Sequence, residues 1–142
     1  MADRHVLCCK ACGTTLTRAV EIVLRADSES GTPDWTPKKP VTPPGQAFRM
    51  TQAYAWSADP RTAVHLGHVP IEFLNVDDIG PSVKLTRKSQ YLNGCCGLDG
   101  CDGPNQICQC GNEIGTLKSD CWTPHTFIPF PDGTRWEVES TP

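Results

Sequence analysis

Apolar and polar residues alternate along several short segments of the chain, as they do in β-strands with one buried face. The alternation is clearest from Leu16 to Leu24, where the even positions are mostly apolar and rich in β-branched residues. We therefore predict a strand there. The other predicted strands are 5–9, 48–56 (through Phe48, Met50, Tyr54 and Trp56), 71–76 and 83–85.

Turn-forming residues separate these segments. Pro131-Asp132-Gly133 lies between the apolar runs 127–130 and 134–138, and Asp-Gly in this position predicts a β-hairpin. Asp77 is the expected N-cap of one helical turn that ends near Gly80. The segment 26–46 holds five prolines, which predicts a connecting loop. The pattern indicates one mostly β domain, 1–142, built from short antiparallel strands.

Composition and charge narrow the classes of protein. With 142 residues the chain is long enough for one hydrophobic core. Its net charge of -3, with Lys84, Arg87 and Lys88 as the densest basic group, argues against nucleic-acid binding. No apolar run approaches the ~18 residues of a membrane span. The N-terminal residues do not have the form of a signal peptide, so we expect a cytoplasmic protein.

Cysteines form two groups near the two ends of the chain. The nine are Cys8, Cys9, Cys12, Cys95, Cys96, Cys101, Cys108, Cys110 and Cys121. Because the cytoplasm keeps thiols reduced, so many cysteines indicate metal ligation rather than disulfides. The metal that this ligand type favours is zinc.

Two short motifs predict where the zinc binds. Cys9-Lys10-Ala11-Cys12-Gly13 has the spacing of a zinc knuckle, in which a glycine eases the turn that points backbone amides at the thiolates. Cys108-Gln109-Cys110-Gly111 also ends in a cysteine followed by glycine, but one residue rather than two separates its cysteines. Two ligands from each knuckle complete a tetrahedral site of Cys9, Cys12, Cys108 and Cys110. The alternatives are buried free thiols or a redox dithiol.

These knuckles carry a resemblance to zinc ribbons and to the β-tent group of Yippee, cereblon and methionine sulfoxide reductase B. That group places such knuckles on a β-tent with a long insertion between them. Here 95 residues separate Cys12 from Cys108. The C-x-C spacing of Cys108 and Cys110 departs from that of the group and is similar to the spacing in glutathione-dependent formaldehyde-activating-like proteins. This departure leaves Cys96 as an alternative ligand to Cys108. The resemblance implies a β-tent-like fold closed by a structural zinc.

Four cysteines of the second group remain: Cys95, Cys96, Cys101 and Cys121. Their number indicates a second zinc. Against this, adjacent cysteines reach one ion with difficulty, and their α-carbons, about 3.8 Å apart, are also too close for an unstrained disulfide. The alternative is that Cys95 and Cys121 are buried or supporting thiols.

For function, we expect a zinc-binding protein that acts as a binding or interaction module for a protein or small molecule, because four thiolates leave zinc no open position. The first alternative is an enzyme, either thiol-dependent, with Cys121 and His125 as a pair, or zinc-dependent, with imidazoles from His65 and His68. The second is a small acidic inhibitor or immunity-type protein, which the size and charge fit.

Overall fold

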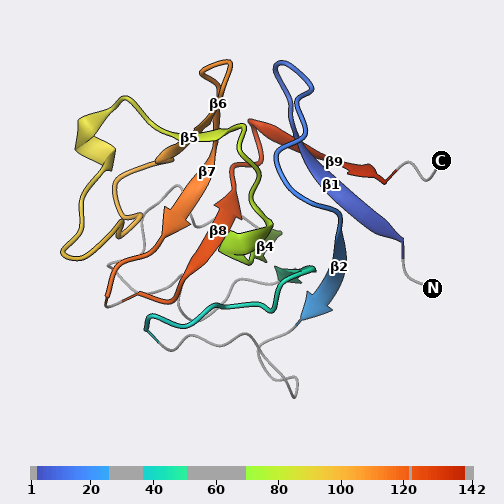
Figure 1. Ribbon diagram of the computed structural model, residues 1–142, viewed down its shortest axis with the longest axis horizontal. Helices are drawn as coiled ribbons and strands as arrows, with labels where there is room; N and C mark the ends of the chain where they lie inside the picture. Colours follow the sequence, from blue (N-terminus) through green and yellow to red (C-terminus); the bar gives the residue numbers. More distant parts are fainter. Residues whose placement is uncertain (1–2, 26–36, 51–69, 122, 140–142) are drawn as a thin grey trace.

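The structure, a computed structural model, describes residues 3–25, 37–50, 70–121 and 123–139. They form the mostly β domain that the sequence predicts, a single sheet of nine strands that curls into a half-barrel (Figure 1). The strands are β1 (Arg4–Cys9), β2 (Val20–Arg25), β3 (Gln46–Met50), β4 (Ile71–Leu74), β5 (Val83–Leu85), β6 (Gln106–Cys108), β7 (Glu113–Lys118), β8 (Thr126–Pro129) and β9 (Thr134–Val138).

The order of strands across the sheet is β5-β6-β7-β8-β4-β3-β2-β1-β9. All neighbouring pairs are antiparallel except β2 and β3, which run parallel from Glu21 opposite Gln46 to Arg25 opposite Met50. Parallel neighbours need a long return connection, and the proline-rich segment between these two strands is long enough to provide it. This one pairing departs from the antiparallel arrangement that we expected.

Buried side chains form two clusters. The larger consists of Leu7, Cys9, Leu16, Val20, Ala47, Leu74, Cys108, Ile114 and Phe127. The smaller consists of Val41, Met50, Ile71, Phe73 and Ile128. Neighbouring residues of β4 and of β8 enter different clusters, because successive side chains of a strand point to opposite faces. The centre of the sheet is therefore packed on both sides.

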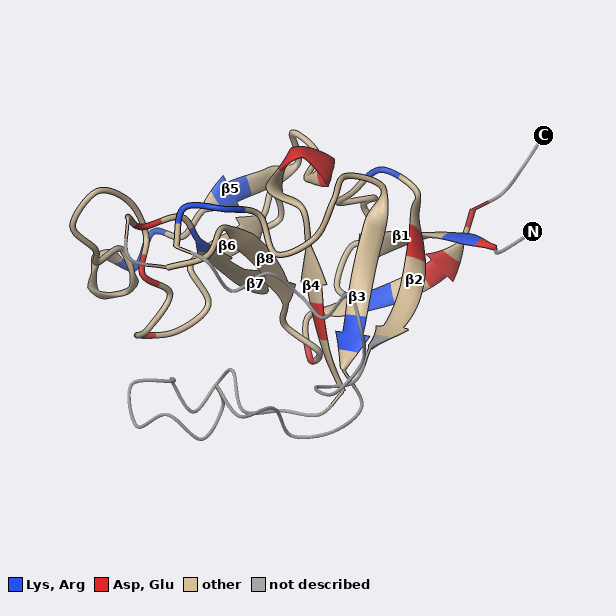
Figure 2. Ribbon diagram, turned by 90° about the horizontal axis from the view of Figure 1, so that it is seen from below, with Lys and Arg blue, Asp and Glu red and all other residues tan. Residues whose placement is uncertain are grey.

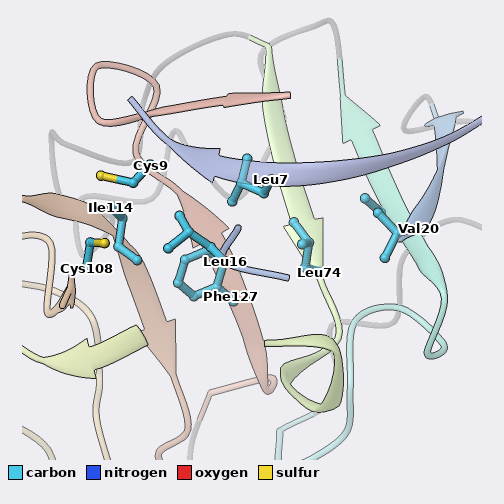
Figure 3. Packing of buried hydrophobic residues seen from close by; sticks show 9 residues of the cluster. Leu7, Cys9, Leu16, Val20, Leu74, Cys108, Ile114 and Phe127 are labelled. Atoms are coloured by element: carbon cyan, nitrogen blue, oxygen red, sulfur yellow. The ribbon is translucent and has the colours of Figure 1, made fainter. Parts of the chain in front are cut away.

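Cys9 and Cys108 belong to the larger cluster and lie at one end of it, beside Ile114 (Figure 3). Each is fully buried. Packing in the hydrophobic core thus positions one cysteine from each predicted knuckle without the help of a metal ion.

The predicted hairpin at Asp132-Gly133 is wrong. A turn does form, since the Gly133 amide donates to the Phe130 carbonyl at 3.0 Å. The strands on either side nevertheless pair elsewhere, β8 with β7 and β4, and β9 with β1. Neither Asp132 nor Gly133 has the positive φ that a tight two-residue hairpin turn requires.

Two other predictions on local structure need adjustment. The helical turn is a 3-10 turn, η3 (Val76–Asp78), and its cap is Asn75, whose side chain accepts from the Asp77 amide at 2.8 Å. The strand expected from Leu16 begins only at Val20. A second 3-10 turn, η4 (Ser89–Tyr91), precedes the cysteine-rich stretch. The predicted strand positions Tyr54 and Trp56 lie outside the described residues.

Candidate metal centre

The two predicted knuckles are tight turns, one after β1 and the other between β6 and β7. In the first, the Cys9 amide donates to the Thr14 carbonyl and the Gly13 amide to the Cys9 carbonyl, both at 2.8 Å. In the second, the Cys108 amide donates to the Asn112 carbonyl and the Gly111 amide to the Cys108 carbonyl, also both at 2.8 Å. The second turn thus repeats the first with one residue fewer.

A glycine closes each turn in a backbone conformation that other residues rarely adopt. Gly13 has a φ of 79° and Gly111 a φ of 96°. At such positive φ angles a β-carbon crowds the backbone, which is why glycine is favoured there. The two glycines that follow the cysteine pairs in the sequence are explained by this geometry.

The turns bring four sulfur atoms together. The sulfurs of Cys9, Cys12, Cys108 and Cys110 all lie within 4.8 Å of one another. The Cys9 and Cys110 sulfurs are 3.7 Å apart, and those of Cys12 and Cys108 are 3.5 Å apart. Four thiolates bound to one zinc ion in a tetrahedron, at about 2.3 Å from it, place their sulfurs about 3.8 Å apart. The two printed distances are close to this value, so the four cysteines could hold one metal ion.

The site lies at the margin of the core. Cys9 and Cys108 are buried, and Cys12 and Cys110 are exposed. Two loops far apart in the sequence lie next to each other at one end of the molecule to form it (Figure 1). β1 is the eighth strand in the order and β6 the second, so the sulfurs connect opposite parts of the curled sheet.

Backbone amides point at the sulfurs in the same pattern in both knuckles. In each pair, the sulfur of the first cysteine accepts a hydrogen bond from the backbone amide of the second cysteine. The sulfur of the second cysteine accepts from the backbone amide two residues later, which is that of Thr14 in the first knuckle and Asn112 in the second. Such amides stabilise thiolates. Hydrogen bonds from the side chain and backbone of Thr14 lower the pKa of Cys12 to about 6. Burial has the opposite effect at Cys108 and raises its pKa to about 12.

An asparagine and a glycine support the site, and the sequence analysis missed both. The side-chain amide of Asn112 lies 3.5 Å from the Cys9 sulfur and donates to the Gly133 carbonyl at 3.1 Å. The same carbonyl accepts from the Lys10 amide at 2.9 Å. Gly133 therefore connects the first knuckle with the second. The only sequence signal was the position of Asn112 directly after Gly111.

Comparisons with known proteins do not place the chain in a family. No family model, curated protein or solved structure matches it. The likeness to zinc ribbons and β-tents thus consists of the knuckles themselves.

A second cysteine group lies elsewhere. The sulfurs of Cys95, Cys96 and Cys121 are within 4.8 Å of one another. Of the two alternatives for the first group, Cys108 lies with Cys9, Cys12 and Cys110, whereas Cys96 lies in the second group. Cys101 is not part of either group, and its thiol contacts the Asp99 carbonyl at 3.6 Å.

No histidine of the described residues joins either cysteine group. His65 and His68 lie outside the described residues. The backbone of His125 pairs with that of Lys39 and Val41, and its buried Nε2 atom has no hydrogen-bond partner among the described residues. His125 does not join the group of ligand atoms at Cys121.

Two further observations bear on partners. No helix in the described part of the chain has the length and apolar character needed to cross a membrane. Acidic and basic residues are interspersed along the described strands and loops (Figure 2).

Proposed function

We propose that this protein binds one zinc ion through Cys9, Cys12, Cys108 and Cys110, and that it acts as a binding module whose fold the ion stabilises. The observation that supports this most strongly is the convergence of four sulfurs from two knuckle turns, with the distances and amide contacts that a zinc tetrathiolate needs.

The role of the ion in this proposal is structural. Four thiolates saturate zinc, so no position remains for a reactive water. The ion would connect β1 with the turn between β6 and β7, two parts of the sheet that share no strand pairing. Zinc binding in small domains contributes of order ~10–16 kcal/mol, which is comparable to the whole stability of an ordinary domain, about 5–15 kcal/mol.

The surface proposed for binding lies over β1, β2, β3 and β9. An open hollow of about 460 Å³ is lined there by His5, Ile22, Leu24, Arg49, Trp136 and Val138. Leu24 and Val138 are 63% and 59% exposed, which is unusual for large apolar side chains. Adjacent exposed apolar residues favour a protein or small ligand with an apolar group as the partner. The net charge of -3 and the interspersed charges disfavour nucleic acid.

The proposal includes a reducing compartment, the cytoplasm, because oxidised cysteines cannot serve as thiolate ligands. All nine cysteines are unpaired in the structure.

Elemental analysis of protein purified without chelator, combined with thiol alkylation at neutral pH, tests the proposal. We expect zinc that stays bound to the protein through gel filtration, and protection of Cys9, Cys12, Cys108 and Cys110 from the alkylating agent. Cys8, which is buried but outside the site, serves as the reference for protection by burial alone. A zinc-free protein, or fast alkylation of the two exposed ligands Cys12 and Cys110, would contradict the proposal.

A further inference from the structure

The group of Cys95, Cys96 and Cys121 differs from the first site in composition and exposure. It has three sulfurs within 4.8 Å of one another rather than four. Cys95 and Cys96 are exposed, and Cys121 is half-buried. No fourth cysteine, histidine or carboxylate of the described ranges joins these three ligand atoms. The group therefore has the donor set of a metal site with one protein ligand missing.

One buried carboxylate organises all three cysteines. Asp120 has no exposed surface. Its oxygens accept the backbone amides of Cys95 at 2.9 Å, Cys96 at 2.8 Å and Cys121 at 2.7 Å. Among the described residues, the carboxylate thus binds the backbone amide of each residue whose sulfur enters the group and of no other residue. Such supporting contacts are typical of sites whose ligands are held in position before the metal binds.

The turn that carries Cys95 and Cys96 packs closely against the segment that carries Cys121. A β-carbon on Gly94 would overlap the Gly97 carbonyl, and one on Gly97 would overlap the Ser119 carbonyl. The amides of Ser119 and Asp120 both donate to the Leu98 carbonyl, at 2.8 and 3.1 Å. The paired cysteines are therefore held against the segment that carries Cys121.

A cation accounts for this arrangement better than free thiols do. The exposed thiols of Cys95 and Cys96 gain little from packing. Three thiols gathered beside a buried carboxylate also repel one another once they ionise. A disulfide between Cys95 and Cys96 is disfavoured because consecutive α-carbons are only about 3.8 Å apart. A metal ion uses all three sulfurs at once and compensates their charge.

We propose that Cys95, Cys96 and Cys121 bind a second, exchangeable metal ion, a thiophilic cation such as Zn(II), and leave its fourth coordination position to a ligand from outside the protein. On binding, the three thiols lose their protons and form three metal–sulfur bonds. Thiolates select soft and borderline cations, and three protein ligands with an open fourth position distinguish such a site from a closed structural one. This inference does not depend on the first site, which uses other residues.

The test is zinc release from the zinc-saturated full chain to a chromophoric chelator. We expect two zinc ions per chain, one that the chelator removes readily and one that it removes slowly. Cys96→Ser should abolish the rapidly released ion and keep the slow one, whereas Cys12→Ser should do the reverse. Cys101→Ser is the matched control, because Cys101 lies in the same loop but outside the group, and it should keep both ions.

The open position needs a measurement of its own. With Co(II) in place of the rapidly released zinc, a small added thiol or imidazole should change the visible absorption bands of that ion. The same addition to the Cys96→Ser variant should leave the spectrum of the remaining ion unchanged.

Three results would overturn the inference. The first is a single zinc per chain in the wild type with Cys95, Cys96 and Cys121 freely alkylated. The second is equal loss of the rapidly released ion in Cys96→Ser and Cys101→Ser. The third is a Co(II) spectrum that no added ligand changes. Because Cys96→Ser must retain the slowly released ion, a variant that merely fails to fold is recognised by the loss of both.

Discussion

The side-chain amide of Asn112 lies 3.5 Å from the sulfur of Cys9, although the two residues are 103 positions apart in the sequence. Asn112 follows the second knuckle, and Cys9 begins the first. An N–H group directed at a thiolate stabilises its negative charge. The second knuckle therefore supports a ligand of the first, in addition to the two ligands that it supplies itself.

Replacing Asn112 by alanine should weaken zinc binding. The change removes the donor to the Cys9 sulfur and the hydrogen bond to the Gly133 carbonyl, while all four ligands remain. Loss of such a supporting contact typically lowers metal affinity by about 10–100-fold. Competition with a chelator of known affinity measures the change. Gln109→Ala, an exposed position in the same knuckle, should bind zinc like the wild type; equal loss in both variants would contradict the role of Asn112.

Single cysteine substitutions should separate ligands from non-ligands. Cys12→Ser and Cys110→Ser each leave three thiolates at the first site, so tight zinc binding at that site should be lost and thermal stability should fall strongly. Cys8 is 3% exposed and is directed away from the ligands, on the opposite face of β1 from Cys9. Cys8→Ser should keep this zinc and cost of order ~1 kcal/mol. Equal melting temperatures for the three variants would show that the ligand assignment is wrong.

The knuckles were predictable because their information is local. A cysteine pair followed by glycine describes one turn, and the structure has that turn at Cys9–Gly13 and at Cys108–Gly111. The short apolar segments likewise predicted β1, β5 and β8 near their observed positions. These features depend on neighbours within a few residues, and periodicity and turn chemistry report them.

Features that depend on distant partners were missed. Asp132-Gly133 has the composition of a hairpin turn, but β8 and β9 find their partners in other strands, so the turn redirects the chain instead. Nothing near Asp120 in the sequence shows that its carboxylate binds amides at Cys95 and Cys96. Cys101 was grouped with these cysteines by counting, whereas its position in space is set by the glycine-rich turns around it.

Gly133→Ala should destabilise the protein through the connection between the knuckles. A β-carbon at this position would overlap the carbonyl oxygen of Glu113, which follows the second knuckle. Overpacking of this kind typically costs about 1–3 kcal/mol. Urea denaturation of the zinc-loaded protein measures the loss. Asp132→Ala, an exposed substitution in the same turn, should change the free energy of unfolding much less, and a similar loss in both would contradict the role of this contact.

Lys118 should make stability depend on alkaline pH. Burial lowers the pKa of Lys118, whose ammonium group donates to the Asp99 carbonyl at 3.0 Å. In the unfolded chain a lysine titrates near about 10.4, so the unfolded state binds this proton more tightly than the folded state does. The free energy of unfolding should therefore rise as the pH rises toward that value.

The comparison of wild type with Lys118→Met isolates this contribution. The wild type should gain stability relative to the variant when the pH rises from about 7 to about 10, because its buried charge is then neutralised. Lys84→Met, at an exposed position of β5, controls for the loss of a positive charge. Parallel stability–pH curves for wild type and Lys118→Met would show that the environment of Lys118 does not disfavour its charge.

Removal of zinc by a chelator should loosen the molecule unevenly. The amides of Cys9 and Cys108 form hydrogen bonds within the knuckles, and that of Lys10 donates to the Gly133 carbonyl. In the proposed site the ion would add bonds to sulfurs of both knuckles. At the centre of the sheet, Met50, Phe73 and Leu74 are buried at 0–1% exposure and packed in the two hydrophobic clusters. Segments with such packing open with a higher free energy than loops do.

Hydrogen–deuterium exchange with and without chelator measures this difference. Exchange should accelerate by the largest factor at residues 8–14 and 107–113 and extend into β1 and β9, while β3 and β4 stay protected longest. Cys12→Ser without chelator should reproduce the pattern at both knuckles, because loss of one ligand releases the same ion. Unchanged exchange at the knuckles after zinc removal would mean that the hydrophobic cluster around Cys9 and Cys108 alone keeps the two ends of the sheet together, and the proposed structural role of the ion would then be wrong.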